Sequence, residues 1–417
     1  MSEEIVEKLA KDVFEGKIRL YQVEEAVKGD SNLATRIRRR AMELATGASL
    51  SNIGNYSIDF NLLLLKNIEN PVGVAQIPMG VAGPLKVNGE YANGTFFVPL
   101  CTTEGALVAS VNRGCAAITA SGGAVSRVIK DGMARAPLFA VPSVEDAKKL
   151  IEWVQKNFEK IVDVVQKTTK HGSLIRIDPH VVGNNVFLRF VFSTGDAMGM
   201  NMATIACDEV RKLIETECPF ADCISLSGNV CVDKKQSAIN FLYGRGKSVV
   251  SEVVLNREII QKILKTTPED IVEVVVRKNL IGSALAGASY GFNAHFANMI
   301  AAIFIATGQD AAQVVESSMG INTAHILENG DLYFSVTLPS LEVGTVGGGT
   351  GLPTQSEALK ILGCQGSGVP PGSNAKKFAE IVAAVVLAGE LSLVSALSAQ
   401  HLAEAHKRLG RGGEKKP

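Results

Sequence analysis

The fold is decided by residues 173–201, which read SLIRIDPHVVGNNVFLRFVFSTGDAMGMN. Two β-rich runs, Ser173 to Val182 and Val186 to Ser193, flank Gly183-Asn184-Asn185, a composition typical of a hairpin turn. A helical pattern from Met198 to Glu217 follows directly. This stretch therefore predicts two paired strands that lead into a helix.

The sequence on either side extends this pattern. Leu138 to Pro142 predicts a strand, Val144 to Thr168 one or two helices, and Cys223 to Leu226 a short strand. The resulting order, β-α-β-β-α-β, is that of a ferredoxin-like unit. Because the two ends of such a unit lie close together, residues 137–226 are predicted to form a small domain inserted into a larger one.

The rest of the chain differs from this unit in composition and in pattern. Residues 1–68 are charged and helical in pattern and predict an N-terminal helical domain. Residues 69–136 and 227–417 are rich in glycine and short apolar segments, and Asn374 to Ser398 predicts a long helix. The predicted fold class is α+β, with a large α/β domain built around that long helix.

Composition excludes several classes of protein. Lys plus Arg and Asp plus Glu both number 42, so no net charge attracts nucleic acid or an anionic membrane. We expect no membrane-spanning helix, because Glu380 and Glu390 interrupt the most apolar run, Ile381 to Ala388. The seven cysteines form no CxxC pair and predict reduced thiols in a cytoplasmic protein, without a zinc site.

Two glycine-containing segments resemble nucleotide motifs but break their spacing. The run from Gly347 to Gly351 fails the dinucleotide pattern at Leu352. Gly246-Lys247-Ser248 resembles the end of a phosphate loop, but Phe241 occupies the position of the required glycine. A standard dinucleotide fold and a nucleoside triphosphatase are therefore disfavoured.

Other polar residues have both a structural and a chemical interpretation. The helix start after Gly195 suits a phosphate group, yet Asp196 could simply cap that helix. Glu104 would ordinarily be a helix cap and first-turn charge, and Asp310 an N-cap after the helix-ending Gly308. Together with Asp233-Lys234-Lys235 and the C-terminal histidines, this set suits acid-assisted hydride transfer to a carbonyl.

Six motifs occur in an order that resembles the class I hydroxymethylglutaryl-CoA (HMG-CoA) reductases, of the soluble archaeal kind. They are residues 69–73 (ENPVG), 102–105 (TTEG), 195–202 (GDAMGMNM), 227–229 with 233–235 (SGN and DKK), 308–310 (GQD) and 342–350 (EVGTVGGGT). The resemblance covers about residues 60 to 411.

This resemblance implies an NADPH-dependent, four-electron reduction of HMG-CoA to mevalonate and CoA, through mevaldyl-CoA and mevaldehyde. Its four catalytic groups fall on Glu104, Lys234, Asp310 and His406. Lys234 would stabilise the developing oxyanion, Asp310 would orient Lys234 and couple it to Glu104, and Glu104 would be a protonated acid. His406 would protonate the departing thiolate.

The resemblance also implies binding residues and partners. For HMG-CoA these are Arg135, Ser227, Asp233, Lys235, Lys278, Asn298, Ser110, Arg113 and Lys265. For NADPH they are Thr169, Lys170, His171, Asp196, Ala197, Met198, Gly199, Met200, Asn201 and Arg411. Residues 69–136 and 227–417 would form the substrate and dimerisation domain, and residues 137–226 would bind NADP(H). The active site would be shared between subunits of a homodimer or a dimer of dimers.

One departure bears on the cofactor. Lys170 stands where many class I members have arginine, and a lysine holds a 2′-phosphate as a point charge rather than as a fork. Two alternatives stay open: an NAD-linked enzyme that oxidises mevalonate, as class II members do, and a CoA-thioester-binding protein without catalysis. The four catalytic residue types argue against the second.

Overall fold

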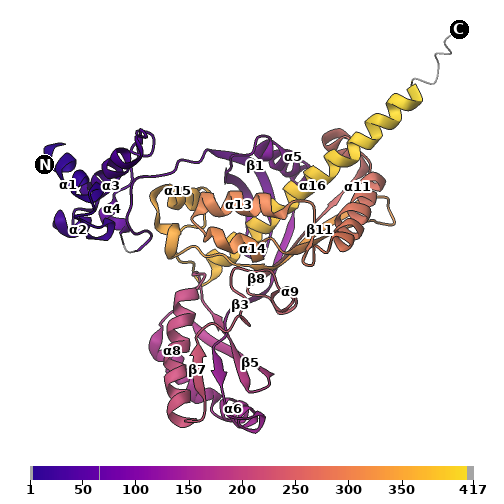
Figure 1. Cartoon of the computed structure of the whole chain (residues 1–417). Helices are drawn as coiled ribbons and strands as arrows, with labels where there is room; N and C mark the ends of the chain where they lie inside the picture. Colours follow the sequence, from indigo (N-terminus) through magenta and orange to yellow (C-terminus); the bar gives the residue numbers. More distant parts are fainter. Residues whose placement is uncertain (1–2, 65, 411–417) are drawn as a thin grey trace. The chain divides into compact units, whose positions relative to one another are not determined.

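The computed structural model describes residues 3–64 and 66–410, with only the backbone considered for residues 400–410. The chain divides into two compact units, Met1–Pro78 and Met79–Pro417 (Figure 1). The finer division into three domains, with residues 137–226 as an insertion, stays a prediction.

The first unit is helical. It contains α1 (Glu3–Phe14), η1 (Leu20–Gln22), α2 (Val23–Ala26), α3 (Ser31–Thr46) and α4 (Phe60–Leu63). Helix α3 begins where the Asp30 carboxylate accepts a hydrogen bond from the Leu33 amide, and it ends at Gly47, whose φ of 70° favours glycine. Ala10 and Ile37 are buried where α1 and α3 pack together.

The second unit is built on a nine-stranded sheet. Its order is β7-β4-β6-β3-β8-β11-β10-β9, with β5 paired to the other edge of β6. The strands are β3 (Val125–Arg135), β4 (Leu138–Ala140), β5 (Ser173–Val182), β6 (Asn185–Ser193), β7 (Asp222–Ser225), β8 (Gly246–Leu255), β9 (Gly291–Phe292), β10 (Gly320–Ile326) and β11 (Leu332–Leu341). A separate antiparallel pair consists of β1 (Met79–Asn88) and β2 (Asn93–Cys101).

Strand β3 joins two parts of this sheet. Its residues Val125 to Gly132 pair with β8, whereas Met133 to Arg135 pair with β6. Beyond β6 the strands follow the spatial order β7-β4-β6-β5, all antiparallel. The helices α6 (Val144–Lys156), α7 (Phe158–Thr168) and α8 (Met200–Glu217) bury their apolar sides with these strands in one core cluster.

The longest helix, α16 (Ser373–Gly410), lies at the centre of the larger core. It packs closely on α5 (Leu107–Ala120): a Cβ added to Gly114 would lie 1.9 Å from the Ala388 carbonyl oxygen, so only glycine fits there. By length and composition, Ser373–Ala399 is apolar enough to cross a membrane, which corrects our expectation from the sequence. However, 83% of its most apolar window is buried inside the fold, as in a core helix.

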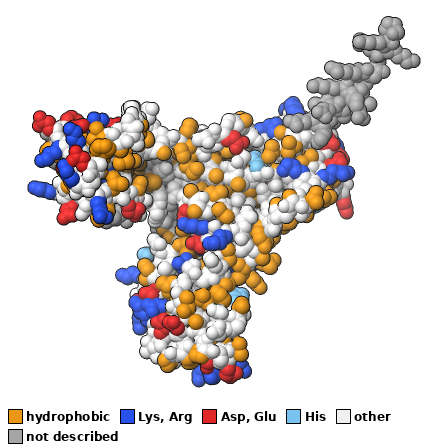
Figure 2. Space-filling view, viewed as in Figure 1, with side chains coloured by type: hydrophobic (Ala, Val, Ile, Leu, Met, Phe, Trp, Pro, Cys, Tyr) orange, Lys and Arg blue, Asp and Glu red, His pale blue; other side chains and the backbone are white. Residues whose placement is uncertain are grey.

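The remaining elements of this unit surround α16 and the sheet (Figure 1). They are α9 (Ala238–Tyr243), α10 (Arg257–Ile259), η2 (Ile260–Leu264), α11 (Pro268–Val274), η3 (Val275–Gly282), α12 (Ser283–Ala286), α13 (Phe296–Thr307), η4 (Ala311–Gln313), α14 (Val314–Ser317), η5 (Gly348–Gly351) and α15 (Pro353–Ile361). Figure 2 shows acidic and basic side chains mixed over the visible face, in keeping with the balanced charge of the sequence.

Candidate active site

The loop that follows β7 has an unusual backbone. Asn229, Val232 and Lys234 all have positive φ, at 63°, 45° and 59°. For a β-branched residue such as Val232 this conformation is strained, and strain of this kind costs about 1–3 kcal/mol per residue. The loop is held by hydrogen bonds from the Gly228 amide to the Ala136 carbonyl and from the Asn240 side chain to the Val232 carbonyl. The fold therefore maintains Lys234 in a conformation that a free loop would avoid.

Lys234 and Asp310 form an ion pair. The Lys234 Nζ lies 3.0 Å from an Asp310 carboxylate oxygen, and both side chains are partly exposed. The hydrogen bond to Asp310 is the main cause that raises the pKa of Lys234, so the lysine is a cation at neutral pH. Asp310 also accepts a hydrogen bond from the Ala312 amide at the start of η4. It therefore performs both roles considered from the sequence, N-cap and lysine partner.

Behind this pair, Asp233 belongs to a buried group of charges. Its carboxylate accepts hydrogen bonds from Arg245 at 3.0 Å and from Gln313 at 2.8 Å. Arg245 is fully buried and also donates to Glu316 and Glu342. Burial opposes ionisation of Asp233, but Arg245 and Gln313 outweigh it and lower the pKa of this carboxyl group.

The three carboxylates around Arg245 have the composition of a metal site, since their oxygens lie within 4.8 Å of one another. The guanidinium group donates to each of them, so an internal cation already pairs with all three carboxylates. Burial raises the pKa of Glu342 strongly and that of Glu316 to a smaller extent. The second carboxylate oxygen of each of these two glutamates has no hydrogen-bond partner among the described residues. We call Asp233, Lys234, Asp310 and Arg245 the lysine cluster.

A second group lies around the start of α13. The His295 Nε2 contacts the Gly389 carbonyl at 2.9 Å, and its Nδ1 lies 3.2 Å from the Asn298 amide nitrogen. Burial lowers the pKa of His295, which the nearby Glu104 carboxylate opposes only in part. The buried Glu390 carboxylate accepts hydrogen bonds from the His295 and Ala294 amides. We call Glu104, His295, Asn298 and Glu390 the histidine cluster.

Lys278 belongs to the surroundings of the histidine cluster, because its charge acts on both Glu390 and His295. Glu104 itself is exposed in the single chain. It precedes α5, whose N-cap is Ala106 and carries no side-chain cap. The capping interpretation of Glu104 is therefore wrong, and the described residues of this chain do not bury Glu104 as a protonated acid would require.

Two of the residues assigned to CoA, Ser110 and Arg113, lie on α5 and contact α16. Ser110 Oγ lies 3.0 Å from Ser392 Oγ on α16, and Arg113 donates both to that hydroxyl and to the Ser392 carbonyl. Lys265 ends η2 with a φ of 60°. Arg135 ends β3, and its buried Nε has no hydrogen-bond partner among the described residues.

The segments assigned to NADPH meet after β6. Gly195 approaches the His171 carbonyl oxygen, because a Cβ on Gly195 would lie 3.4 Å from it. Helix α8 begins after Gly199, which has a φ of 92° and provides no side-chain cap, so no N-cap side chain occupies the first amides. Lys170 is exposed and forms no ion pair with a described residue. A helix start with open amides beside a free cation fits a phosphate-bearing cofactor.

Asp196 has a different role from the one considered. Its buried carboxylate accepts hydrogen bonds from the Gly368, Gly372 and Ala375 amides, at 2.8–2.9 Å. It therefore caps the start of α16, a distant helix, and not α8, which corrects the simple capping interpretation. This carboxylate fixes the loop that leads into α8 to the N-terminus of the longest helix.

Several residues that contribute to these sites were not predicted from the sequence. They are Arg245, Glu316, Gln313, His295, Glu390, Ser392 and Gly344. Gly344 packs against the cofactor segment, because a Cβ there would lie 2.6 Å from the Met198 amide nitrogen. Signals existed for two of them: Arg245 stands between two glycines, and Gly344 lies in the motif of residues 342–350.

The structure brings some of the proposed catalytic residues together and leaves others apart. Lys234 and Asp310 are in contact, but within the described part of the chain no hydrogen bond or ion pair joins them to Glu104 or His295. His406 lies on α16, in the part for which only the backbone is considered, and Arg411 lies outside the described residues. One chain thus presents two separate groups of catalytic candidates.

Comparisons with known proteins agree on one family. The family model of hydroxymethylglutaryl-coenzyme A reductase matches residues 34–411. A 3-hydroxy-3-methylglutaryl-coenzyme A reductase from Pyrococcus abyssi is 60% identical over 410 residues, which cover 98% of this chain and 99% of that protein. The protein of the same name from Methanocaldococcus jannaschii is 54% identical over 95% of this chain and 97% of its own.

A solved structure shares the fold at much lower identity. The class II 3-hydroxy-3-methylglutaryl-CoA reductase from Streptococcus pneumoniae, bound to NADPH in open conformations, superposes with a TM-score of 0.65 over 84% of both chains at 19% identity. Together with the family match and the archaeal relatives, the arrangement of the motifs leads to one conclusion. This chain belongs to the HMG-CoA reductase family.

Proposed function

We propose that this chain catalyses the NADPH-dependent reduction of (S)-HMG-CoA to (R)-mevalonate and CoA, the reductive step of the mevalonate route to isoprenoids. Two NADPH and two protons are consumed for each CoA released. The observation that carries the proposal is the Lys234 ammonium, held 3.0 Å from Asp310 on a strained loop. The family membership of the chain also supports the proposal.

Lys234 is the group that stabilises negative charge on the substrate oxygen. Its raised pKa keeps it cationic, and its partly exposed Nζ retains N–H donors besides the one used by Asp310. The strained backbone and the ion pair fix the ammonium in advance, so that little reorganisation accompanies the reaction. Asp310 orients this lysine, whereas Glu104 and His406 supply protons to the aldehyde oxygen and to the CoA thiolate.

The substrate carboxylate needs cations that are not already neutralised. The unpartnered Nε of Arg135 meets this requirement, and Lys235 and Lys278 add positive charge. Ser227, Asp233 and Asn298 complete the HMG pocket, and Ser110, Arg113 and Lys265 contact CoA.

The cofactor is held by the segment that connects β6 with α8. NADPH supplies a hydride when bound there. Residues Asp196 to Asn201 offer backbone amides at the start of α8, while Thr169, Lys170 and His171 face the 2′-phosphate, together with Arg411. We propose that residues 137–226 form a ferredoxin-like inserted unit for this purpose; the antiparallel order β7-β4-β6-β5 supports it.

We propose that the active enzyme is a homodimer, or a dimer of dimers, in which each site takes the lysine cluster from one subunit and the histidine cluster from its partner. The absence of a described contact between the two clusters in one chain, and the exposure of Glu104, support this arrangement. The seven free cysteines support a reducing, cytoplasmic setting.

The activity is tested with purified protein, HMG-CoA and either NADPH or NADH. We expect mevalonate with two NADPH oxidised per CoA released. Lys234→Ala should abolish turnover with an unchanged circular dichroism spectrum, whereas Lys148→Ala, at an exposed lysine on α6 outside the proposed site, should behave as wild type. NAD-dependent oxidation of mevalonate without reduction of HMG-CoA would instead place the enzyme in the degradative direction.

The shared site is tested by mixing inactive variants. Random assortment of Lys234→Ala with Glu104→Ala subunits should restore about a quarter of the wild-type activity, because half of the dimers are mixed and each mixed dimer has one intact site. Lys234→Ala mixed with Asp310→Ala should restore none, since these two residues pair within one chain. No recovery in the first mixture would refute the division between subunits.

A further inference from the structure

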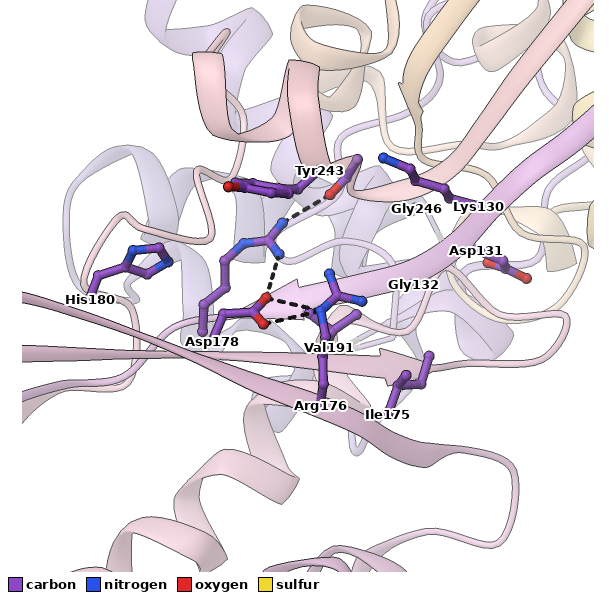
Figure 3. A pocket seen from close by; sticks show the side chains of 12 residues that line it. Lys130, Asp131, Gly132, Ile175, Arg176, Asp178, His180, Val191, Tyr243 and Gly246 are labelled. Atoms are coloured by element: carbon purple, nitrogen blue, oxygen red, sulfur yellow. Dashed lines mark hydrogen bonds and ion pairs between the residues drawn. The ribbon is translucent and has the colours of Figure 1, made fainter. Parts of the chain in front are cut away.

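A pocket of about 570 Å³ lies on the sheet, next to the two glycines that flank Arg245 of the lysine cluster. It is lined by parts of β3, β5 and β6 and by the turn between α9 and β8: Lys130, Asp131, Gly132, Ile175, Arg176, Asp178, His180, Arg189, Val191, Tyr243, Gly244 and Gly246. Figure 3 shows Lys130, Arg176 and His180 arranged around the cavity, with Tyr243 on one wall. None of these residues belongs to the site proposed above.

The main evidence for a ligand in this pocket is the buried side chain of Arg189. Its side chain is 1% exposed, yet its Nε and Nη1 have no hydrogen-bond acceptor among the described residues. Only Nη2 donates a hydrogen bond, to the Gly244 carbonyl at 2.9 Å, and the Asp178 carboxylate is 3.6 Å from Nη1. Buried arginine donors are normally satisfied, so two open N–H groups that border a cavity indicate a missing acceptor.

Asp178 does not satisfy these donors, because its oxygen lies 3.6 Å from Arg189 Nη1, beyond hydrogen-bond distance, and its carboxylate pairs more closely with Arg176. The Arg176 Nε lies 3.1 Å from both oxygens of the Asp178 carboxylate. Burial lowers the pKa of Arg189, and Asp178 offsets this shift only in part. The pocket therefore contains a buried guanidinium group with incomplete compensation.

The charge count points to a dianion. Lys130, Arg176 and Arg189 border the pocket. The buried Lys247 forms an ion pair with Asp131, with its Nζ 3.2 Å from a carboxylate oxygen. These four cations face only two carboxylates, which leaves two positive charges when His180 is neutral. The side-chain Nε2 of His180 is also buried without a partner in the described structure.

The pocket and the lysine cluster are neighbours in sequence but are formed by different side chains. Gly244 and Gly246 line the pocket, whereas Arg245 between them donates to Asp233, Glu316 and Glu342. The Gly246-Lys247-Ser248 segment, which fails the phosphate-loop spacing, thus supplies one edge of this cavity.

We propose that this pocket is a second ligand site that binds the phosphate group of a small phosphomonoester. The phosphate dianion supplies acceptors for Arg189 and Arg176 in a forked geometry and for Lys130 as a point charge. Ile175, Val191 and Tyr243 form an apolar wall for the organic part of the ligand. A phosphate group balances both surplus charges at one place, which separate carboxylates of a flexible diacid do less well.

Isothermal titration calorimetry with glycerol 3-phosphate tests the site. The enzyme is first saturated with NADP⁺ and CoA, so that the phosphate subsites of the catalytic centre are covered. We expect one binding event per chain, and malonate at the same ionic strength should bind at least about ten-fold more weakly. No heat with glycerol 3-phosphate, or equal binding of malonate, would overturn the proposal.

Three variants assign the binding event to this pocket. Arg189→Met should weaken it by roughly 10- to 100-fold, the range expected for a lost charge-assisted hydrogen-bond pair. Arg176→Met provides the same test at a side chain that is 45% exposed, and it decides the question if Arg189→Met does not fold. Arg211→Met, at an ion-paired arginine on α8, should bind as wild type. Unchanged affinity in the folded Arg176 or Arg189 variant would refute the site.

Discussion

Replacing Asp196 with alanine should strongly destabilise the second unit, although the residue lies in a loop. The Asp196 carboxylate accepts three hydrogen bonds from the amides of Gly368, Gly372 and Ala375. These amides lie at or just before the start of α16, the helix around which the large core is built. Loss of the carboxylate leaves all three donors without their acceptor.

The magnitude follows from the number and burial of these bonds. Each buried donor that loses its acceptor costs about 1–3 kcal/mol, so three cost roughly 3–9 kcal/mol. Because Asp196 is 5% exposed and water can replace part of the lost bonding, we expect the lower half of that range, about 3–5 kcal/mol. This is a large share of the 5–15 kcal/mol that is typical of a folded protein.

The Asp196→Asn variant provides an intermediate loss of stability for comparison with Asp196→Ala. One oxygen accepts from Gly368 and Gly372, and the other accepts from Ala375. An asparagine oriented with its carbonyl toward the two glycines keeps two bonds and loses one. Asp196→Asn should therefore cost about 1–3 kcal/mol, clearly less than Asp196→Ala.

Urea unfolding followed by circular dichroism measures these changes, and hydrogen exchange localises them to residues 368–375. Asp163→Ala, at an exposed aspartate on α7, is the control and should stay within about 0.5 kcal/mol of wild type. Equal stability of wild type and Asp196→Ala, or unchanged amide protection at the start of α16, would contradict the assigned role.

Three further predictions concern catalysis and pH. His406→Gln should slow reduction of HMG-CoA far more than reduction of supplied mevaldehyde, because only the thioester releases a thiolate; equal losses in steady-state assays would exclude that role. Burial raises the pKa of Glu390 from 4.5 to about 7, against the opposing effect of the Ala294 and His295 amides. The folded-state pKa therefore lies above the unfolded one, so this group's contribution to stability is complete below about pH 4.5 and is lost as the pH rises through 7, by about 3 kcal/mol. Unfolding titrations should show a smaller pH slope for Glu390→Gln, and an identical slope would disprove the linkage. Lys170→Ala should raise KM for NADPH without changing KM for NADH, while Lys170→Arg preserves the preference; parallel changes for both cofactors would show that Lys170 does not contact the 2′-phosphate.

Local patterns predicted much of the secondary structure. The hairpin of β5 and β6 follows from two β-rich runs around Gly183 and is confirmed, but Val182 pairs with Asn185, so the turn has two residues and not the three that we expected. Gly308 ends α13 with a φ of 70°, as its position after an apolar helix indicated. These features depend on residues that are neighbours in the sequence, so a single sequence was enough to predict them.

The interactions that organise the site depend on distant partners and could not be predicted in this way. Asp196 accepts hydrogen bonds from residues more than 170 positions away. The Arg245 group joins three carboxylates from different segments, and its net charge depends on burial that composition does not reveal. The apolar run in α16 likewise looks the same in sequence whether it faces lipid or a protein core.

The anchoring of α16 has a consequence for biosynthesis on the ribosome. Glu380 on this helix accepts the amides of Glu90, Tyr91 and Ala92, and Glu390 accepts those of Ala294 and His295. All these partner segments are translated before the helix that holds them. The nascent chain must therefore keep the surfaces of its large core exposed until α16 emerges, which makes the interval before its release the period in which chaperones matter most.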